Sequence, residues 1–304
     1  MDDKAQHRIH SQVCPVCGSS SLLPFLSCTD YLTTKEVFEI CKCKQCGFAL
    51  TQDFPSEDMI APYYEAPAYI SHTDTHKGIV NSLYHLARKM ALKSKSKLVT
   101  HYASQKSGML LDIGSGTGYF LNRMKQLKWI VTGIEKSESA RAYAKQKFNM
   151  DCQKSEYLYD IPAKTKDVIT MWHVLEHLEH LNEVMDRLHT ILKDDGIAII
   201  ALPNKDSFDA AYYKEFWAAY DVPRHLWHFS PSDFLHLADK HNFQLIDIKP
   251  MYLDAFYISM LSEQSKGSFM ASICGLVKGG IFFLRTLANK KRSSSLIYIL
   301  KKKQ

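Results

Sequence analysis

The sequence predicts a doubly wound α/β domain that follows a small cysteine-containing domain. Three observations carry this prediction. Strand-like and helix-like segments alternate from Met109 onward, a glycine-rich turn follows the first of these strands, and two Cys-x-x-Cys pairs stand near the N-terminus. We therefore divide the chain into a cysteine domain (1–50), an aromatic linker with a leading helix (51–104) and a core domain (105–304).

The elements of the core domain follow from hydrophobic periodicity and from stop signals. Residues 77–104 have helical spacing ahead of the core domain. Within it we expect strands at 109–113, 130–135, 150–153, 167–172, 196–202, 243–249 and 296–300, and helices at 120–127, 137–148, 181–192 and 231–241. Ser137 and Ser230 are the expected N-caps of two of these helices. Alternation of this kind is typical of a parallel sheet with helices on both faces.

Composition excludes several classes of protein. The 304 residues are 46% hydrophobic and 23% charged, which excludes a disordered chain, a collagen-like repeat and a disulfide-dense scaffold. Lys and Arg outnumber Asp and Glu by 38 to 32, a net charge of +6 that does not by itself indicate a nucleic-acid partner. The first residues are polar with no apolar run, so we expect no secretory signal and a cytoplasmic location.

The strongest local signal is the segment Asp112-Ile113-Gly114-Ser115-Gly116-Thr117-Gly118. Glycine at alternate positions lets a ligand approach the backbone closely, and the following helix presents its N–H groups there. The spacing is not the G-x-G-x-x-G of dinucleotide-binding turns. Tight turning alone is the alternative explanation, but three alternate glycines after an Asp favour a ligand site.

The pattern Asp112-x-Gly114-x-Gly116-x-Gly118 resembles motif I of the class I S-adenosylmethionine-dependent methyltransferases. Glu135 stands 17 residues after Gly118, where that family has an acidic ribose ligand. Residues 167–178 are similar to the family's fourth strand and its Leu-Glu-His continuation. The resemblance covers about residues 105–250 and implies a Rossmann-like, seven-stranded methyltransferase sheet, a methyl-transferring enzyme and S-adenosylmethionine as its cofactor.

The resemblance also implies a set of cofactor-binding residues. They are Asp112, Gly114, Ser115, Gly116, Thr117, Gly118, Glu135, Ser155, Glu156 and His173. The family's Gly-Asp pair is missing at 154–158, which puts Ser155 and Glu156 in doubt. Glu135 can also be read as a solvated strand end, and Glu176 with His177 as an ordinary first turn of a helix.

The two cysteine pairs, Cys14/Cys17 and Cys43/Cys46, each precede a glycine, and 25 residues separate Cys17 from Cys43. Four thiolates in two such knuckles predict a closed, tetrahedral Zn²⁺ site of structural type. A pair of reduced dithiols or a redox disulfide is the alternative. Cys41 is the nearest competing ligand, and Cys28 is the other. We expect the cysteine domain to have a core separate from that of the catalytic domain.

A four-cysteine domain ahead of a class I core resembles two groups of methyltransferases. One acts on small molecules and sugars, and its zinc domain folds against the substrate cleft. The other comprises ribosomal RNA methyltransferases with a zinc ribbon. The aromatic linker, with Tyr63, Tyr64, Pro67 and Tyr69, is similar to the first group. The deoxysugar C-methyltransferases have an additional C-terminal domain that we do not expect in this chain, which puts a nucleotide-sugar acceptor in doubt.

Histidines after the fourth and fifth predicted strands are the candidate bases for proton removal from an acceptor. His173 and His177 follow the fourth strand, while His225 and His228 lie in the segment 221–230, which resembles a Pro-Arg-His-Leu-x-His-Phe-Ser stretch of bacterial glycan and lipid methyltransferases. We place His225 first and His177 second as catalytic residues. Arg224 is expected to hold a polar or anionic acceptor. A packed loop with structural histidines is the alternative.

The tail, 268–292, is an apolar helix with basic residues. We expect it to pack on the sheet before the last strand; the alternative is an interfacial helix that contacts a membrane. The preferred function is a methyltransferase for a small-molecule, sugar or lipid-linked acceptor. A ribosomal RNA methyltransferase is opposed by the balanced charge of residues 14–46. The third hypothesis is a non-catalytic protein that binds S-adenosylmethionine.

Overall fold

The computed structural model describes residues 8–64, 79–103 and 105–303, with side chains described from residue 88 onward in the second range. Pro67 and Tyr69 of the predicted aromatic linker lie outside the described residues. The leading helix is α2 (Ile79–Tyr102), close to the range expected from its spacing.

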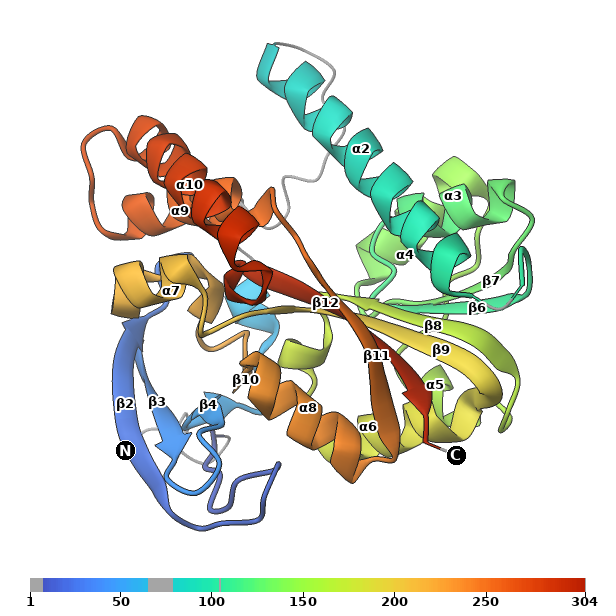
Figure 1. Cartoon of the computed structure of the whole chain (residues 1–304), viewed down its shortest axis with the longest axis horizontal. Helices are drawn as coiled ribbons and strands as arrows, with labels where there is room; N and C mark the ends of the chain where they lie inside the picture. The colour runs from blue at the N-terminus through green and yellow to red at the C-terminus, as the bar shows by residue number, and fades with distance from the viewer. Residues whose placement is uncertain (1–7, 65–78, 104, 304) are drawn as a thin grey trace.

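A six-stranded sheet in the order β11-β12-β9-β8-β6-β7 forms the centre of the larger domain (Figure 1). Its strands are β6 (Met109–Ile113), β7 (Ile130–Ile134), β8 (Lys166–Trp172), β9 (Leu192–Pro203), β11 (Phe243–Pro250) and β12 (Ser295–Lys302). Strands β6 to β9 are parallel, and β12 is antiparallel to both of its neighbours, as expected for the last strand. The sheet changes direction of winding at β6, so ligand-binding loops are expected beside that strand.

The predicted strand over 150–153 is reduced to a single parallel bridge between Ile134 and Gln153. It occupies the seventh position, at the β7 edge of the sheet. The segment has four residues, of which Met150 is buried but Asp151 is exposed, so it lacks the run of strand-forming side chains that would extend the pairing.

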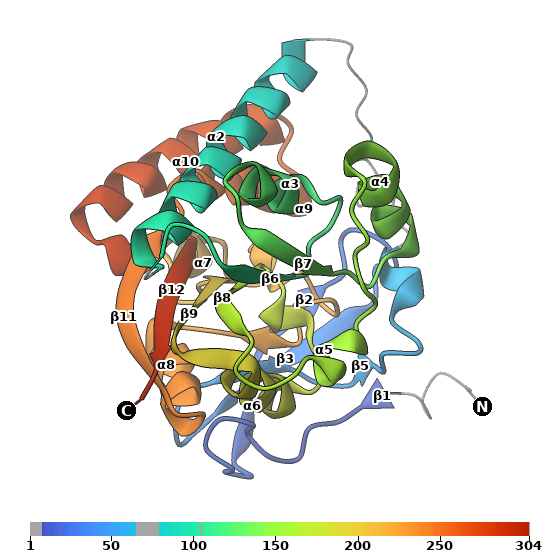
Figure 2. The same ribbon diagram turned by 90° about the vertical axis from the view of Figure 1, so that its right-hand side faces the viewer.

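Helices cover both faces of the sheet, and Figure 2 shows α2 and α3 on one face and α6 and α8 on the other. The remaining helices are α3 (Tyr119–Gln126), α4 (Glu138–Phe148), α5 (Tyr157–Asp160), α6 (Leu181–Ile191), α7 (Phe208–Tyr213), α8 (Pro231–Lys240), α9 (Asp254–Ser265) and α10 (Ala271–Ala288). Both predicted caps are confirmed. Ser137 accepts a hydrogen bond from the Ala140 amide, and Ser230 forms a reciprocal capping box with Asp233.

The N-terminal unit contains a second sheet in the order β10-β4-β3-β2 and a two-stranded pair, β1-β5. These strands are β1 (Arg8–Ile9), β2 (Leu22–Thr29), β3 (Val37–Cys43), β4 (Ala49–Thr51), β5 (Phe54–Pro55) and β10 (Trp227–His228), and the short helix η2 (Ala61–Tyr64) follows. Strand β10 belongs to the larger domain by sequence, but it pairs with β4 of the N-terminal unit, Trp227 with Leu50 and His228 with Ala49. The larger domain therefore completes the sheet of the N-terminal unit.

The two units share a hydrophobic core, so the expectation of separate cores is wrong. Buried Phe48 and Leu50 belong to the same cluster as Leu226, Trp227 and the side chains on one face of the central sheet. The ring of Phe48 stacks at 6.2 Å from that of Trp227. The reason is the pairing of β10 with β4, which places large apolar side chains of the larger domain in the smaller unit. The domain boundaries at 50 and 104 stay a prediction.

Helix α10 packs against α9 and α7. The expectation that it packs on the sheet is therefore wrong. Two glycines make the contact with α9 close. A Cβ atom on Gly275 would lie 2.4 Å from Met260 Cα, and one on Gly279 would lie 2.6 Å from Phe256 Cα. The α9–α10 hairpin therefore stands beside the central sheet, joined to it through β11 and β12 (Figure 1).

Candidate active site and cysteine cluster

The glycine turn leaves β6 in a conformation that requires glycine. Gly114, Gly116 and Gly118 have φ values of 71°, 52° and 79°, in the left-handed region that other residues rarely adopt. A Cβ atom on Gly114 would clash with Val174, at 2.3 Å, whereas one on Gly116 would meet nothing within 4 Å. Gly114 is thus needed for packing, and Gly116 faces open space that a ligand could fill.

Glu135 follows β7 and reaches the glycine turn. Its Oε2 atom accepts a hydrogen bond from the Gly116 amide at 2.7 Å, and its Oε1 atom accepts one from the Ser137 amide at 2.8 Å. The structure therefore brings together Glu135 and the turn, as the sequence predicts. Ser155, half-buried, and Glu156, exposed, follow the Gln153 bridge next to Glu135.

Asp112 lies beneath the turn with 1% of its surface exposed. Thr170 Oγ1, from the adjacent strand β8, donates a hydrogen bond to Asp112 Oδ1 at 2.6 Å. Burial raises the pKa of the Asp112 carboxyl to about 7, although the Thr170 hydroxyl and the Lys95 ammonium act in the opposite direction. Sequence reasoning missed both partners, because a threonine in a strand and a lysine in a helix carry no signal of their own.

His173 comes directly after β8 and lies between two carboxylates. Its Nδ1 atom is 3.4 Å from Glu176 Oε1, and its Nε2 atom is 3.4 Å from Asp254 Oδ2, at the start of α9. Loss of hydration alone would lower the pKa of His173, but Asp254 and Glu176 raise it to about 9. The imidazole is therefore positively charged near neutral pH.

Glu176, in the short helix η3 (Leu175–His177), is fully buried. His173 Nδ1 balances its charge from 3.4 Å, but within the described part of the chain neither carboxylate oxygen has a partner in hydrogen-bond geometry. A buried carboxylate without well-formed hydrogen bonds is costly, which makes the position a candidate functional one. Ligand atoms of Glu176, His177 and His225 all lie within 4.8 Å of one another. The neighbouring histidines lower the pKa of Glu176 against the effect of burial.

The rings of His177 and His225 meet edge to face, with centroids 4.5 Å apart. His177 Nδ1 lies 3.0 Å from the Arg224 carbonyl oxygen, and His225 Nδ1 lies 2.8 Å from that of Ala219. A carbonyl oxygen only accepts, so each neutral ring holds its proton on Nδ1 and keeps a lone pair on Nε2. Loss of hydration and the adjacent His225 lower the pKa of His177 to about 4.

The N-terminal unit also reaches this cluster. The hydroxyl of Tyr64, at the end of η2, is 3.1 Å from His177 Nδ1. The aromatic stretch singled out in the sequence thus closes one side of the histidine cluster. Sequence reasoning did not identify Glu176, Asp254 or Tyr64 as members of the site. Of these, Glu176 had a signal in its place within the Leu-Glu-His segment, and Tyr64 had one in the aromatic linker.

Arg224 does not hold an acceptor, contrary to expectation, because the fold already occupies it. The side chain is 1% exposed, and its Nη2 atom pairs with Asp30 at 2.9 Å and with Asp221 at 2.6 Å. Its Nη1 atom donates to the Tyr63 carbonyl oxygen at 2.9 Å. The guanidinium therefore ties the N-terminal unit to the larger domain.

His228 is structural as well. Thr51 donates its hydroxyl proton to the His225 carbonyl oxygen at 2.8 Å, so it must accept from His228 Nε2 at 2.9 Å. Burial lowers the pKa of His228 well below its usual value. Of the histidines considered, His225 and His177 are the two whose ring nitrogens lie with the Glu176 carboxylate in one cluster.

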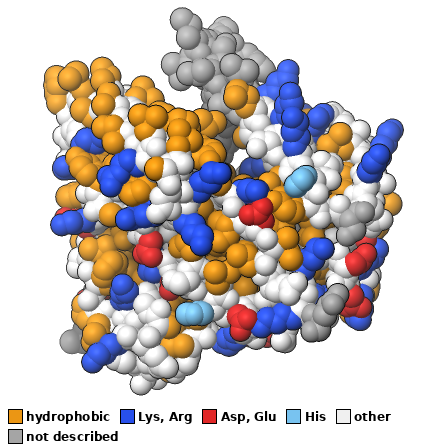
Figure 3. All heavy atoms as spheres, viewed as in Figure 1, with side chains coloured by type: hydrophobic (Ala, Val, Ile, Leu, Met, Phe, Trp, Pro, Cys, Tyr) orange, Lys and Arg blue, Asp and Glu red, His pale blue; other side chains and the backbone are white. Residues whose placement is uncertain are grey.

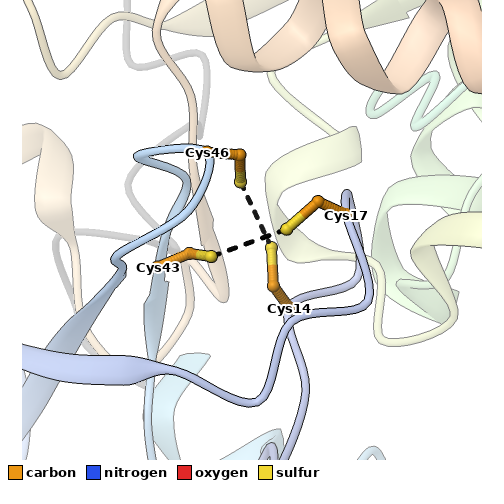
Figure 4. A group of neighbouring side chains, drawn as sticks. All are labelled: Cys14, Cys17, Cys43 and Cys46. Carbon is orange, nitrogen blue, oxygen red and sulfur yellow. Dashed lines mark hydrogen bonds between the residues drawn. The ribbon is translucent and has the colours of Figure 1, made fainter.

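The four predicted cysteine ligands converge on one point (Figure 4). Cys14 Sγ is 3.5 Å from Cys46 Sγ, and Cys17 Sγ is 3.6 Å from Cys43 Sγ. Gly18 and Gly47, which follow the two pairs, have φ values of 76° and 83°, as tight knuckles need. Cys41 donates instead to Glu39, at 3.0 Å, and Cys28 packs in a separate apolar cluster. Neither competes for the central position.

A surface hollow of about 680 Å³ lies at the other end of the parallel strands, where β8 and β9 begin. Lys164, Asp194 and Lys302 are among the residues that line it. It includes none of the predicted site residues. Open α/β sheets bind their ligands at the carboxyl ends of the strands, so we assign the active site to the turn and the histidine cluster.

Comparisons with known proteins agree with the fold. A family model described as "Methyltransferase domain" matches residues 84–248. A ubiquinone biosynthesis O-methyltransferase of Rickettsia bellii is 26% identical over 164 residues, which cover 50% of this chain and 68% of that protein. A malonyl-[acyl-carrier protein] O-methyltransferase of Bacillus anthracis is 30% identical over 128 residues, 40% of this chain and 47% of that one.

Among solved structures, a putative sarcosine dimethylglycine methyltransferase from Galdieria sulphuraria superimposes with a TM-score of 0.50 at 13% identity. The superposition covers 72% of this chain and 86% of that one. It supports the Rossmann-like arrangement of the sheet. The family match spans more than half of the chain, from within α2 to within β11. The chain therefore belongs to the methyltransferase domain family and is an enzyme that transfers methyl groups from S-adenosylmethionine.

Proposed function

We propose that this methyltransferase acts on a small-molecule, sugar or lipid-linked acceptor, with the cofactor at the glycine turn and the acceptor at the histidine cluster. The observation that carries the proposal is the cluster of Glu176, His177 and His225, in which a fully buried carboxylate lies with two imidazoles whose ligand atoms are within 4.8 Å of one another. A methyl acceptor that is a hydroxyl, an amine or an acidic carbon must lose a proton, and this cluster can receive it.

The residues of the turn fit S-adenosylmethionine. Gly116 has open space where a Cβ atom would stand, so a ligand can approach its backbone. Each Glu135 oxygen accepts one amide proton and retains a second lone pair, which suits the ribose hydroxyls. The bound cofactor would supply an activated methyl group, and the role of Gly114–Gly118 and Glu135 would be to orient it.

On the acceptor side, His225 Nε2 would take the proton, because Nδ1 is committed to the Ala219 carbonyl oxygen. Glu176 would stabilise the imidazolium that forms, a role that fits a buried carboxylate within 4.8 Å of the His225 ring nitrogen. His177, whose pKa is lowered to about 4, stays neutral and can relay or replace that base. His173 carries a positive charge between Asp254 and Glu176 and helps to fix both carboxylates.

The cysteine cluster fits a structural Zn²⁺ ion. In a tetrahedron with Zn–S bonds of about 2.3 Å, neighbouring sulfurs stand about 3.8 Å apart, close to the separations of 3.5 and 3.6 Å here. Four sulfur ligands leave no position for water, so the ion would hold the fold and would not take part in catalysis. None of the eight cysteines forms a disulfide, so the four sulfurs of the cluster remain available as thiolate ligands.

The named relatives support a small acceptor over RNA. The names of the Rickettsia and Bacillus proteins refer to ubiquinone biosynthesis and to malonyl-[acyl-carrier protein], not to a nucleic acid. Residues 14–46 hold three lysines (Lys35, Lys42, Lys44) against three acids (Asp30, Glu36, Glu39), so this stretch has no net positive charge to attract a phosphate backbone.

The test is transfer of labelled methyl groups. The purified enzyme would be incubated with methyl-labelled S-adenosylmethionine and metabolite extracts separated into organic, aqueous and RNA fractions. We expect label in the organic or aqueous small-molecule fraction, and none with the variant His225→Ala. Label in the RNA fraction alone would overturn the acceptor assignment. Binding of S-adenosylmethionine without label in any fraction would overturn the catalytic one.

A further inference from the structure

The α9–α10 hairpin carries a continuous apolar face that no described part of the chain covers. In Figure 3 its side chains form the orange region at the upper left, over the position of α9 and α10 in Figure 1. The exposed fractions along α10 are 57% for Ile273, 60% for Val277 and 63% for Leu284. Leu276, Ile281 and Leu287 are about half exposed, and Phe269, just before the helix, is fully exposed.

The pattern along α10 is amphipathic in an unusual sense. The buried positions are Gly275, Gly279, Phe282 and Thr286, which repeat every three or four residues and face α9 and α7. The large aliphatic residues occupy the opposite face. A helix in a soluble domain normally turns its small and polar residues outward. In α10 the large aliphatic side chains face outward and the small residues face inward, so the outer face is suited to contact with a nonpolar environment.

Basic residues border the apolar face. Between Ser265 and Ser293 the chain has no Asp or Glu, but it has Lys266, Lys278, Arg285, Lys290, Lys291 and Arg292. Lys278 pairs with Glu263 of α9, and the guanidinium of Arg285 lies over the Phe208 ring at 4.2 Å. Lys290 and Lys291, in the turn η6 (Lys290–Arg292), are exposed. Apolar side chains with a cationic border match the boundary between acyl chains and anionic head groups.

By length and composition α10, with 18 residues and a mean hydropathy of 1.4, could cross a membrane. The topology argues for a helix that lies along the surface. The hairpin leaves the sheet after β11 and returns to it as β12, and these two strands are antiparallel neighbours. Both ends of the hairpin therefore stay on the same side of any bilayer, which a single spanning helix cannot satisfy.

We propose that the α9–α10 hairpin is an in-plane membrane anchor that inserts the outer face of α10 into a bilayer containing anionic lipids. The hairpin starts at Asp254, which contacts His173 of the site at 3.4 Å. An anchor at this position holds the entrance of the active site close to the membrane surface. The proposal depends on the surface of α10 and not on the identity of the acceptor.

A second copy of the chain is the competing occupant of this face, and charge disfavours it. Lys266 precedes α10, and Lys290 to Arg292 follow it, so both ends of the helix are basic. Parallel or antiparallel pairing of two such helices would place cations against cations. Anionic lipids would neutralise them instead, at about fivefold in affinity for each Lys or Arg near the surface.

The test is co-sedimentation of the whole chain with vesicles of phosphatidylcholine alone or mixed with phosphatidylglycerol. We expect binding to the mixed vesicles that weakens as salt increases. Leu284→Asp should reduce this binding at least tenfold, since the substitution removes an aliphatic side chain that the bilayer would bury and adds a negative charge that anionic lipids repel. The matched control is Ile130→Asp at the start of β7, because Ile130 has the same exposed fraction, 63%, and lies away from the hairpin.

The cationic border is tested by Lys290→Gln with Lys291→Gln, which should weaken binding to mixed vesicles by about 25-fold. Equal loss in Ile130→Asp, or no vesicle binding by the unaltered protein, would overturn the proposal. Sedimentation velocity adds the last arm. A concentration-dependent dimer that Leu284→Asp dissociates, together with no vesicle binding, would assign the face to a second copy.

Discussion

Arg224 Nη2 and Asp30 Oδ1 lie 2.9 Å apart although 194 positions separate the two residues in the chain. Both side chains are at most 1% exposed. Asp30 lies in the turn after β2. Its carboxylate also accepts hydrogen bonds from the backbone amides of Leu32, Thr33 and Thr34. Arg224 directly precedes His225, and its carbonyl oxygen fixes the ring of His177. The ion pair thus connects the N-terminal unit to the proposed base.

The first prediction concerns this ion pair. Asp30→Ala leaves a buried guanidinium with Asp221 as its remaining carboxylate partner, so the free energy of unfolding should fall by about 3 kcal/mol. Urea denaturation measures it. The control is Glu57→Ala, which breaks the exposed ion pair with Lys136 and should cost less than about 1 kcal/mol. Equal effects of the two substitutions would show that the buried pair has no special role.

The same ion pair makes the free energy of unfolding depend on pH. Burial alone would raise the pKa of Asp30, but the Thr34 amide and the Arg224 guanidinium lower it to about 2, below the unfolded value of about 3.9. The stability that Asp30 contributes is therefore present above pH 4 and is lost as the pH falls towards 2. The difference in unfolding free energy between the unaltered protein and Asp30→Ala should shrink over that interval.

Local signals predicted much of the fold. The caps at Ser137 and Ser230 and the alternating strands and helices follow from short stretches of sequence whose physical cause is also short-range. Helix α9 was missed because it has no apolar period. It buries Ser259, Ser262 and Glu263 while other positions hold the large residues.

The site was harder to predict because its members meet only through long-range pairing. Strand β10 has two residues, too few for any pattern, yet it carries the segment around His225 into the sheet of the N-terminal unit. Arg224 appeared to be a ligand for an acceptor because its sequence neighbours are histidines and aromatics. Which carboxylates the fold would bring to it, Asp30 above all, cannot be read from residues so far apart in the chain.

The second prediction is that Gly116→Val reduces the affinity for S-adenosylmethionine at least 100-fold in calorimetry. The added side chain would fill the open space beside the turn. The control is Gly267→Val, since Gly267 also has a positive φ, 76°, and open space around a Cβ atom, but lies between α9 and α10. Both variants carry backbone strain of about 1–3 kcal/mol. Unchanged affinity in Gly116→Val would remove the cofactor from this turn.

The third prediction is one Zn²⁺ per chain by metal analysis, with loss of the ion in Cys46→Ser and full retention in Cys41→Ser. Cys46 belongs to the four-sulfur cluster, whereas Cys41 donates to Glu39. Because Cys14, Cys43 and Phe48 share a core with Leu226 and Trp227, loss of the ion should also lower the melting temperature of the larger domain. Full zinc content in Cys46→Ser would contradict the assignment.

The fourth prediction concerns His173, whose imidazole should titrate with a pKa of about 9 in NMR spectra. Glu176 and Asp254 face the ring, and Lys95 acts on Asp254 from α2. A histidine with a raised folded pKa stabilises the fold fully below its unfolded pKa, about 6.5, and this contribution disappears as the pH rises through 9. Asp254→Asn should move the titration to lower pH; an unchanged pKa would exclude Asp254 as its cause.

The last prediction separates the base from the cofactor site. His225 lies between β9 and β10, in a cluster with Glu176 and His177, whereas the glycine turn and Glu135 follow β6 and β7. His225→Ala should therefore leave the affinity for S-adenosylmethionine nearly unchanged and slow methyl transfer by about 10²–10⁴-fold, which corresponds to about 3–5 kcal/mol of barrier. His177→Ala is the matched comparison for the transfer rate, since the neutral ring of His177 carries the other available lone pair of the cluster. If His225→Ala retains full activity and His177→Ala does not, His177 is the base. If His225→Ala loses cofactor affinity, the assignment of His225 to the acceptor side is wrong.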